Sequence, residues 1–292
     1  MPQWEGKSKG TSTGYKIFVF LIKNIGIGGA YLLLRFVSLY YFLFSSSTSK
    51  PILSFYRNML KFSKSKSLKL LYLNYFKLGQ TLIDKVALMS GARTNFTFDF
   101  DGEQHLREMI AKGSGGLLLS GHLGSWEAAG HLLKRLNTRI NIVMYDGEDA
   151  NIKQYMDAIT GEKSFNIIYV RGDLEHIFKI NQALSNNEIV CMHADRFLSG
   201  NKTIIADFLG MPAKFPEGPF LLAQRLKVPV VYVYAFKETN THYHFYSTGI
   251  KNFDSQKGDT VQIILNDYVK SLETMVHKYP EQWFNYYNFW KS

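Results

Sequence analysis

Short β-rich runs alternate with amphipathic helical segments from Thr94 onward, and this alternation restricts the possible folds more than any other feature. Runs of β-branched and aromatic residues predict strands, and apolar residues at three- and four-residue spacing predict helices. Their alternation is typical of a three-layer α/β domain with a mixed sheet flanked by helices. The predicted strands are Phe96–Phe100, Gly116–Leu119, Ile140–Tyr145, Asn166–Val170, Ile189–His193, Thr203–Phe208, Pro229–Phe236 and Tyr243–Tyr246, and the main predicted helices are Trp126–Leu136, Leu174–Leu184, Pro219–Leu226 and Thr260–His277.

The first third of the chain differs from the rest in charge. Residues 1–93 hold 14 Lys and Arg against two acids, a net charge of +12, whereas residues 94–292 have a net charge of −2. The whole positive excess of the chain, +10, therefore lies in the first third. A basic segment beside a nearly neutral body predicts docking to an extended anionic surface, either a membrane leaflet or a nucleic acid.

An apolar stretch inside that basic third favours the membrane. Ile17–Phe44 is interrupted by Lys23, Arg35 and three glycines, so no uncharged run reaches the ~20 residues of a spanning helix. A helix or a broken pair of helices lying in the membrane interface, with Lys16 and Lys23 on one face, fits better. A single span with snorkelling charges and a core helix of a soluble domain remain alternatives.

The next segment is also predicted to be helical. Pro51 to about Ser90 carries apolar residues at helical spacing, and its lysines share roughly one side. That side is either solvated or in contact with anionic headgroups. We expect residues 1–92 to form a helical, membrane-anchoring region and residues 93–292 to form the α/β domain. No nucleic-acid-binding module is present, so nucleic acid is not an expected partner. The lysines that share one side of the segment from Pro51 to about Ser90 are Lys61, Lys64, Lys66 and Lys69.

The segment Gly115–Leu133 holds the strongest candidate for catalysis. A predicted buried strand runs into a turn that carries His122, and a helix then begins near Glu127. Ligands of open α/β sheets bind outside the carboxyl ends of the strands, where this turn would lie. Gly121 and Gly124 allow unusual backbone angles or the close approach of a ligand. The segment predicts a functional turn, with a structural role for His122 as the competing interpretation.

The five-residue spacing of His122 and Glu127 has a mechanical meaning. On one ideal helix the two side chains would lie roughly 140° apart and would not meet. With His122 in the turn and Glu127 in the first helical turn, the carboxylate can reach one imidazole nitrogen. That contact would fix the tautomer and leave the other nitrogen to accept a proton. The pair predicts a general base and its orienting carboxylate.

Two alternating sets of side chains raise the question of a metal site. Cys191, His193 and Asp195 alternate along one predicted strand, and His242 and His244 alternate along another. Neither set completes a known ligand spacing, so strand packing is the expected role and no metal or cofactor is predicted. The single cysteine also excludes an internal disulfide framework.

Two other classes of protein are alternatives to an enzyme with this general base. A serine hydrolase is disfavoured because neither Ser120 nor Ser125 lies in a G-x-S-x-G elbow. A non-catalytic, lipid-binding membrane scaffold with a degenerate fold would make His122 dispensable.

His122-x4-Glu127 within GHLGSWEAAG resembles the HX4(D/E) motif of the bacterial lipid A biosynthesis (late) acyltransferase family, part of the glycerolipid acyltransferase superfamily. Segments that resemble the later blocks of that family follow in the same order, and the likeness spans about residues 15–290. The later blocks are Ala194–Gly200, Ala206–Ala213, Phe215–Pro219, Val228–Val231 and Pro280–Trp283.

The resemblance implies a glycerolipid acyltransferase-like fold and a reaction at the cytoplasmic face of the inner membrane. Its donor would be an acyl thioester, usually of acyl carrier protein, with coenzyme A as the alternative. Its acceptor would be a membrane lipid or glycolipid. In such a mechanism His122 deprotonates the acceptor hydroxyl and Glu127 orients His122.

Three further residues are carried over as substrate-binding candidates. Arg196 and Glu217 would bind the acceptor headgroup or stabilise developing charge. Alternatively, Arg196 pairs with Asp195 and Glu217 caps the helix that starts near Pro219. Arg171, which follows another predicted strand, is a weaker candidate.

Parts of the chain depart from the typical lipid A enzymes. The tail after the Gln-Trp pair lacks His and Arg, and two N-terminal segments resemble a subgroup associated with aryl polyene or flexirubin-type lipids. The acceptor is therefore open at this point. The two N-terminal segments are Trp4–Gly10 and Phe76–Thr81, and the tail is Phe284–Trp290.

Overall fold

A computed structural model describes residues 12–89, 94–113, 115–125, 128–129, 133–145, 166–171, 174–253 and 258–291. Residues 126–127 and 130–132 of the predicted helix Trp126–Leu136, and the whole predicted motif Trp4–Gly10, lie outside them. The longer helices are α1 (Ser12–Ile25), α2 (Ile27–Phe44), α3 (Ser46–Ser54), α4 (Lys64–Met89), α5 (Glu103–Ala111), α8 (Glu175–Ser185), α9 (Gly218–Leu226) and α10 (Thr260–Lys278). The strands are β1 (Thr97–Asp101), β2 (Gly116–Ser120), β3 (Ile140–Tyr145), β4 (Asn166–Val170), β5 (Ile189–His193), β6 (Thr203–Phe208), β7 (Met211–Pro216), β8 (Val230–Lys237) and β9 (His242–Ser247).

Seven strands form one mixed sheet in the order β1-β9-β8-β2-β5-β3-β4, and β6 and β7 form a separate hairpin. All neighbours in the large sheet are parallel except β8 and β9. Strand β8 is buried at all eight positions, as expected for a central strand covered on both faces. The predicted α/β class with a mixed sheet is confirmed.

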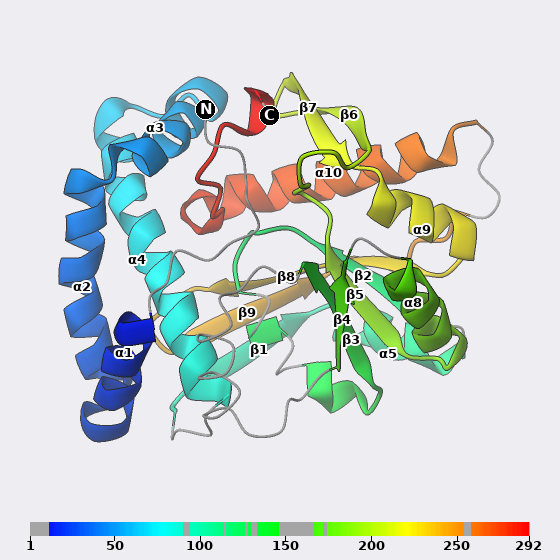
Figure 1. The fold of residues 1–292 in the computed structure, drawn as a ribbon, viewed down its shortest axis with the longest axis horizontal. Helices are drawn as coiled ribbons and strands as arrows, with labels where there is room; N and C mark the ends of the chain where they lie inside the picture. The colour runs from blue at the N-terminus through cyan, green and yellow to red at the C-terminus, as the bar shows by residue number, and fades with distance from the viewer. Residues whose placement is uncertain are drawn as a thin grey trace.

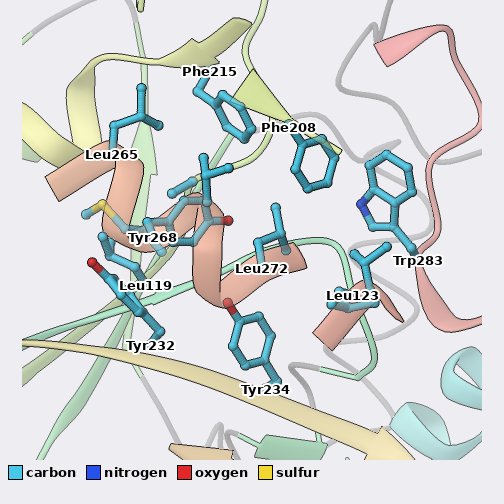
Figure 2. Close-up of a cluster of buried hydrophobic side chains, with 14 of the residues drawn as sticks. Leu119, Leu123, Phe208, Phe215, Tyr232, Tyr234, Leu265, Tyr268, Leu272 and Trp283 are labelled. Carbon is cyan, nitrogen blue, oxygen red and sulfur yellow. The ribbon is translucent and has the colours of Figure 1, made fainter. Parts of the chain in front are cut away.

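Helices cover both faces of this sheet, which gives the three predicted layers (Figure 1). Leu117 and Leu119 of β2 pack with residues of α8 and α10 on one face, whereas Leu118 packs with residues of α5 on the other. Alternate side chains of a strand point to opposite faces, so β2 contributes side chains to the cores on both faces of the sheet. Figure 2 shows the first core, where aromatic side chains from β6, β7, β8 and α10 meet Trp283 of the C-terminal segment.

The N-terminal helices form a third, smaller core. Helices α1 and α2 are separated at Gly26, whose φ of 82° favours glycine, so the predicted broken pair of helices is confirmed. Their inner faces pack on α4, while large apolar side chains point outward. By length and composition α2 could cross a membrane, which for one helix near the N-terminus is weak evidence.

The segment from Pro51 to Ser90 is helical in two parts rather than one. Helix α3 continues into a π-helical turn over Phe55–Met59, and α4 begins only at Lys64. Between them Lys61 has a φ of 55°, which ends the first part. The interruption turns α4 back along α2, as Figure 1 shows.

Buried polar contacts join α4 to the sheet. Nζ of Lys237 at the end of β8 lies 2.5 Å from Oδ2 of Asp84, and both side chains are fully buried. The hydroxyls of Tyr31 and Tyr243 also donate to this carboxylate. Nζ of Lys77 donates to the backbone oxygen of Lys237 at 2.7 Å. The helical region is therefore fixed against β8 and β9 by directional contacts as well as by apolar packing.

Candidate active site

His122 and Asp195 lie at the carboxyl ends of two neighbouring parallel strands. Ser120 of β2 pairs in register with His193 of β5, so His122 and Asp195 each stand two residues beyond a matched position. The amide of Ala194 donates to the oxygen of Ser120 at 2.8 Å, which holds the two chain segments together just past the strands. Parallel register thus brings together two residues that are far apart in the sequence.

The Asp195 carboxylate makes two contacts with His122. Its Oδ1 lies 2.7 Å from Nδ1 of the imidazole, and its Oδ2 accepts the backbone amide of His122 at 2.8 Å. The carboxylate is 1% exposed, and the imidazole is 24% exposed. A buried acceptor on Nδ1 fixes the ring and its tautomer, and leaves Nε2 as the nitrogen that can act as a base.

The surroundings of the pair keep His122 neutral and Asp195 ionised. Burial, followed by the charge of Arg196, lowers the pKa of His122 below its usual value, although Asp195 opposes this. Burial alone would raise the pKa of Asp195, but the contact with His122 and the charge of Arg196 outweigh it, so this pKa lies below its usual range. A neutral imidazole next to a carboxylate is the state that a general base requires.

His193 lies beside His122, with ring centroids 4.3 Å apart. Burial and the neighbouring His122 lower the pKa of His193 to about 3, so it is neutral at physiological pH. It adds no positive charge to the site.

Glycines allow the loop after β2 to pass close to its neighbours. A Cβ on Gly121 would come within 3.2 Å of Oδ2 of Asp195 and of the hydroxyl of Tyr268. Gly124 has a φ of 78°, and a Cβ there would lie 2.1 Å from the oxygen of Ala235. Gly124 therefore has the unusual backbone angle that the sequence predicted, and the close neighbours described at both glycines are protein atoms.

The C-terminal segment holds the same loop from its other side. The amide of Phe284 donates to the oxygen of His122, and the amide of Gly124 donates to the oxygen of Gln282, both at 2.9 Å. The amide of Ser125 donates to the oxygen of Ala235 in β8 at 2.7 Å. The loop that carries His122 is thus fixed between β8 and residues 282–284.

Arg196 is close enough to the pair to influence both of its pKa values. Its guanidinium donates to the backbone oxygen of Phe284 and lies 5.8 Å from the ring centre of Tyr287. It therefore links the segment after β5 to the C-terminal segment. Its role toward a substrate remains a prediction.

The other predicted site residues have different positions. Glu217 directly precedes α9, yet its side chain makes no capping hydrogen bond, so the alternative capping role is not seen. Arg171 follows β4 and is exposed, with its guanidinium 5.7 Å from the ring centre of Tyr169. Strands β2 and β4 are three positions apart in the sheet, about 14 Å, so Arg171 is not brought to His122.

Glu127 lies outside the described residues, and its predicted contact with His122 remains a prediction. Next to it in the chain, the amide of Ala128 donates to Oγ of Ser125 at 3.4 Å, as at a helix N-cap. The described geometry supports Asp195 in the orienting role that was predicted for Glu127.

Asp195 was not predicted from the sequence as the partner of His122. It was predicted only as a member of an alternating set and as a possible partner of Arg196. The available signal was an acidic residue directly after a predicted buried strand. Only the order of β2 and β5 in the sheet shows that this residue meets His122.

Cys191, another residue of that alternating set, has separate surroundings. Burial raises the pKa of the Cys191 thiol to about 12, so it is an unreactive side chain. It packs near the second core, as expected of a small apolar residue.

Comparison with known proteins agrees with these features. Residues 66–292 match the family model of bacterial lipid A biosynthesis acyltransferases. Phosphatidylinositol mannoside acyltransferases from two strains of Mycobacterium tuberculosis are each 28% identical over 123 residues, which cover 42% of this chain and 39% of the relative.

A crystal structure of a 1-acyl-sn-glycerophosphate acyltransferase from Thermotoga maritima aligns with 87% of this chain and 95% of its own, at 12% identity and a TM-score of 0.38. A similarity that distant supports no conclusion about this chain. The family match covers both His122 and Asp195, as well as α4, the whole sheet and the C-terminal segment. The chain belongs to the bacterial lipid A biosynthesis acyltransferase family.

Proposed function

We propose that this acyltransferase moves a fatty acyl chain from an acyl thioester to a hydroxyl of a lipid or glycolipid, with His122 as the general base. The observation that carries the proposal is the contact between Nδ1 of His122 and the buried carboxylate of Asp195, at the carboxyl ends of β2 and β5. Such ends are where open α/β sheets bind their substrates.

The chemistry requires one proton acceptor. Nε2 of His122 takes the proton of the acceptor hydroxyl as its oxygen attacks the thioester carbonyl carbon. The C–O bond forms, the tetrahedral intermediate collapses with cleavage of the C–S bond, and the proton passes from the imidazolium to the leaving thiolate. Asp195 stabilises the imidazolium while it exists.

The remaining site residues have supporting roles in this proposal. Arg196 would attract the negative charge of a headgroup or of the tetrahedral oxygen, since its charge already acts on His122 and Asp195. Glu217 and Arg171 would contact more distant parts of the acceptor. Glu127 would be the second carboxylate that positions the base.

The donor, the acceptor and the location follow from the family and from the N-terminal helices. We infer acyl carrier protein as the donor, with no cofactor, and the cytoplasmic face of the inner membrane as the location. A lipid acceptor fits a relative that acts on a phosphatidylinositol mannoside. It also fits the exposed apolar side chains of α1 and α2, which would lie in the membrane interface.

The test replaces His122 with glutamine in the full chain. Acyl transfer to lipids of a deletion strain, followed by mass spectrometry, should fall at least about 100-fold, while the protein stays in the membrane fraction. His277→Gln, at an exposed histidine of α10, is the matched control and should retain activity. Retained acylation in His122→Gln would contradict the proposal and favour the scaffold function.

A further inference from the structure

A second group of ionisable side chains lies at the connection between β8 and β9, away from His122. Glu238 directly follows β8, and His242 and His244 lie on one face of β9. One ligand atom from each of the three lies within 4.8 Å of the other two. The sequence predicted only strand packing for the two histidines, because it gave no reason to add Glu238. We refer to these three residues as the hairpin cluster.

The spacing of the hairpin cluster suits a small divalent ion. Nε2 of His242 lies 4.0 Å from Oε2 of Glu238, and Nδ1 of His244 lies 3.4 Å from Oε1 of the same carboxylate. A tetrahedral ion with bonds of about 2.0–2.1 Å holds its ligand atoms roughly 3.4 Å apart. Small rotations of side chains that are 19–33% exposed would complete the geometry.

Each imidazole turns one nitrogen toward Glu238 and the other toward an outer polar group. Nδ1 of His242 lies 2.8 Å from Oγ1 of Thr97, and Nε2 of His244 lies 3.2 Å from Oδ2 of Asp101. Metal-binding histidines characteristically place their second nitrogen against such an outer partner, which fixes the tautomer and the ring orientation.

The carboxylate of the cluster is positioned in the same way. The hydroxyl of Tyr279 donates to Oε1 of Glu238 at 2.5 Å, which holds the carboxylate beside the two histidines. The ring of His244 stacks on Tyr246, with centroids 4.1 Å apart and planes 11° from parallel. All three candidate ligands are thus held by neighbouring side chains before any ion arrives.

The local charge also favours a cation. Asp99 and Asp101 on the adjacent strand β1 are 70% and 66% exposed and lie beside the two histidines. Oδ2 of Asp99 lies 3.6 Å from Nε2 of His242, so this exposed carboxylate can supply a fourth ligand. Two imidazoles with carboxylates suit zinc, whereas calcium and magnesium take mostly oxygen ligands.

We propose that Glu238, His242 and His244 bind a divalent transition-metal ion, with zinc as the best fit and Asp99 as the fourth ligand. The ion would join the edge strand β1 to the connection between β8 and β9 and, through Tyr279, to the segment after α10. This site is independent of the proposed acyl transfer.

The experiment uses the full chain in detergent, without a polyhistidine tag. Equilibrium dialysis against buffered zinc with metal analysis should give about one ion per chain, and cobalt should give the visible absorption of a tetrahedral site. His242→Gln and Glu238→Gln should each weaken zinc binding at least about 100-fold, and Thr97→Val about 10–100-fold. His176→Gln, on α8 at the other side of the sheet centre, should leave it unchanged.

Circular dichroism checks that each variant is folded. Failure of the wild-type chain to bind zinc stoichiometrically would overturn the proposal without reference to any variant. Equal affinity in wild type, His242→Gln and Glu238→Gln would overturn it as well. Because the readout is metal content, neither result depends on whether acyl transfer is observed.

Discussion

At the scale of single residues, the imidazole of His122 is partly accessible and is also held in one orientation. Its imidazole is partly exposed, while the Asp195 carboxylate that holds it is almost completely buried. A hydrogen bond to a charged, buried group is stronger than one in water, so the ring keeps one orientation. The imidazole is therefore held on its Asp195 side and remains partly accessible.

Replacing Asp195 with asparagine should lower kcat by about 10²–10⁴-fold, because the imidazolium loses its stabilising charge. The neutral imidazole is the active form, so activity falls as the pH drops through the pKa of His122. Asp195 raises that pKa, which is otherwise lowered by burial. Removing the carboxylate lowers the pKa further, so the acid limb of the pH profile of kcat/KM should move to lower pH.

Glu127→Gln is the informative comparison for this prediction, measured over the same pH range. If Asp195 is the orienting carboxylate, the acid limb of Glu127→Gln should move less than that of Asp195→Asn. The opposite order would return the orienting role to Glu127.

The two partners of the pair differed in how far the sequence could predict them. His122 could be found because its turn, its glycines and the following helix are contiguous in the chain. Asp195 could not be assigned to it, because the contact depends on which strands are neighbours and in which register. Local patterns do not contain that information.

At the scale of elements, strands could be predicted from β-rich runs, whereas the strand that contains prolines could not. Each of the eight predicted strands forms, with ends displaced by no more than one residue. Strand β7 was missed because Pro212 and Pro216 argue against a strand, whereas a two-stranded hairpin tolerates them. Helix α5 was missed as well, because its nine residues give only a short helical pattern.

The contact between α4 and β8 gives a prediction at this scale. Asp84→Ala should lower the free energy of unfolding by about 3–5 kcal/mol, because it leaves the Lys237 ammonium buried without its partner carboxylate. Replacing both residues, with Asp84→Leu and Lys237→Met, should recover much of that loss. Denaturant unfolding in detergent measures both variants.

The matched control is the half-exposed pair of Lys251 and Asp267, whose Nζ and Oδ2 lie 2.8 Å apart. Asp267→Ala should cost about 1 kcal/mol or less, because solvent screens such pairs. Equal losses for Asp84→Ala and Asp267→Ala would show that burial does not strengthen the α4 contact.

At the scale of the whole molecule, the large exposed apolar side chains are concentrated on α1 and α2. Phe20, Phe36 and Phe44 on α1 and α2 are 63%, 66% and 70% exposed, far more than their apolar character favours in water. Figure 1 places both helices at one side of the molecule, beside α4 and away from α8. The basic residues of the first third accompany this surface.

We expect the protein to remain with membranes in high salt, because burial of apolar side chains is not screened by ions. Replacing both Phe20 and Phe36 with aspartate should release it, since each buried Phe contributes roughly 1.5–3 kcal/mol. Sedimentation of membranes at low and high salt measures the bound fraction. Phe178→Asp, at an exposed Phe of α8, is the control. Complete release of the wild-type protein by salt alone would instead indicate a purely electrostatic attachment.

The hydrogen bonds from residues 282–284 to the loop of His122 have a consequence for how the protein is made. A chain leaves the ribosome from its N-terminus, and domains tend to form in that order. Helices α1–α4 therefore emerge first, and the loop emerges long before Gln282 and Phe284, which hold it in place. A nascent chain can thus settle on a lipid surface while its base still lacks a fixed position. The order of translation therefore delays the fixed position of His122 until residues 282–284 have been made.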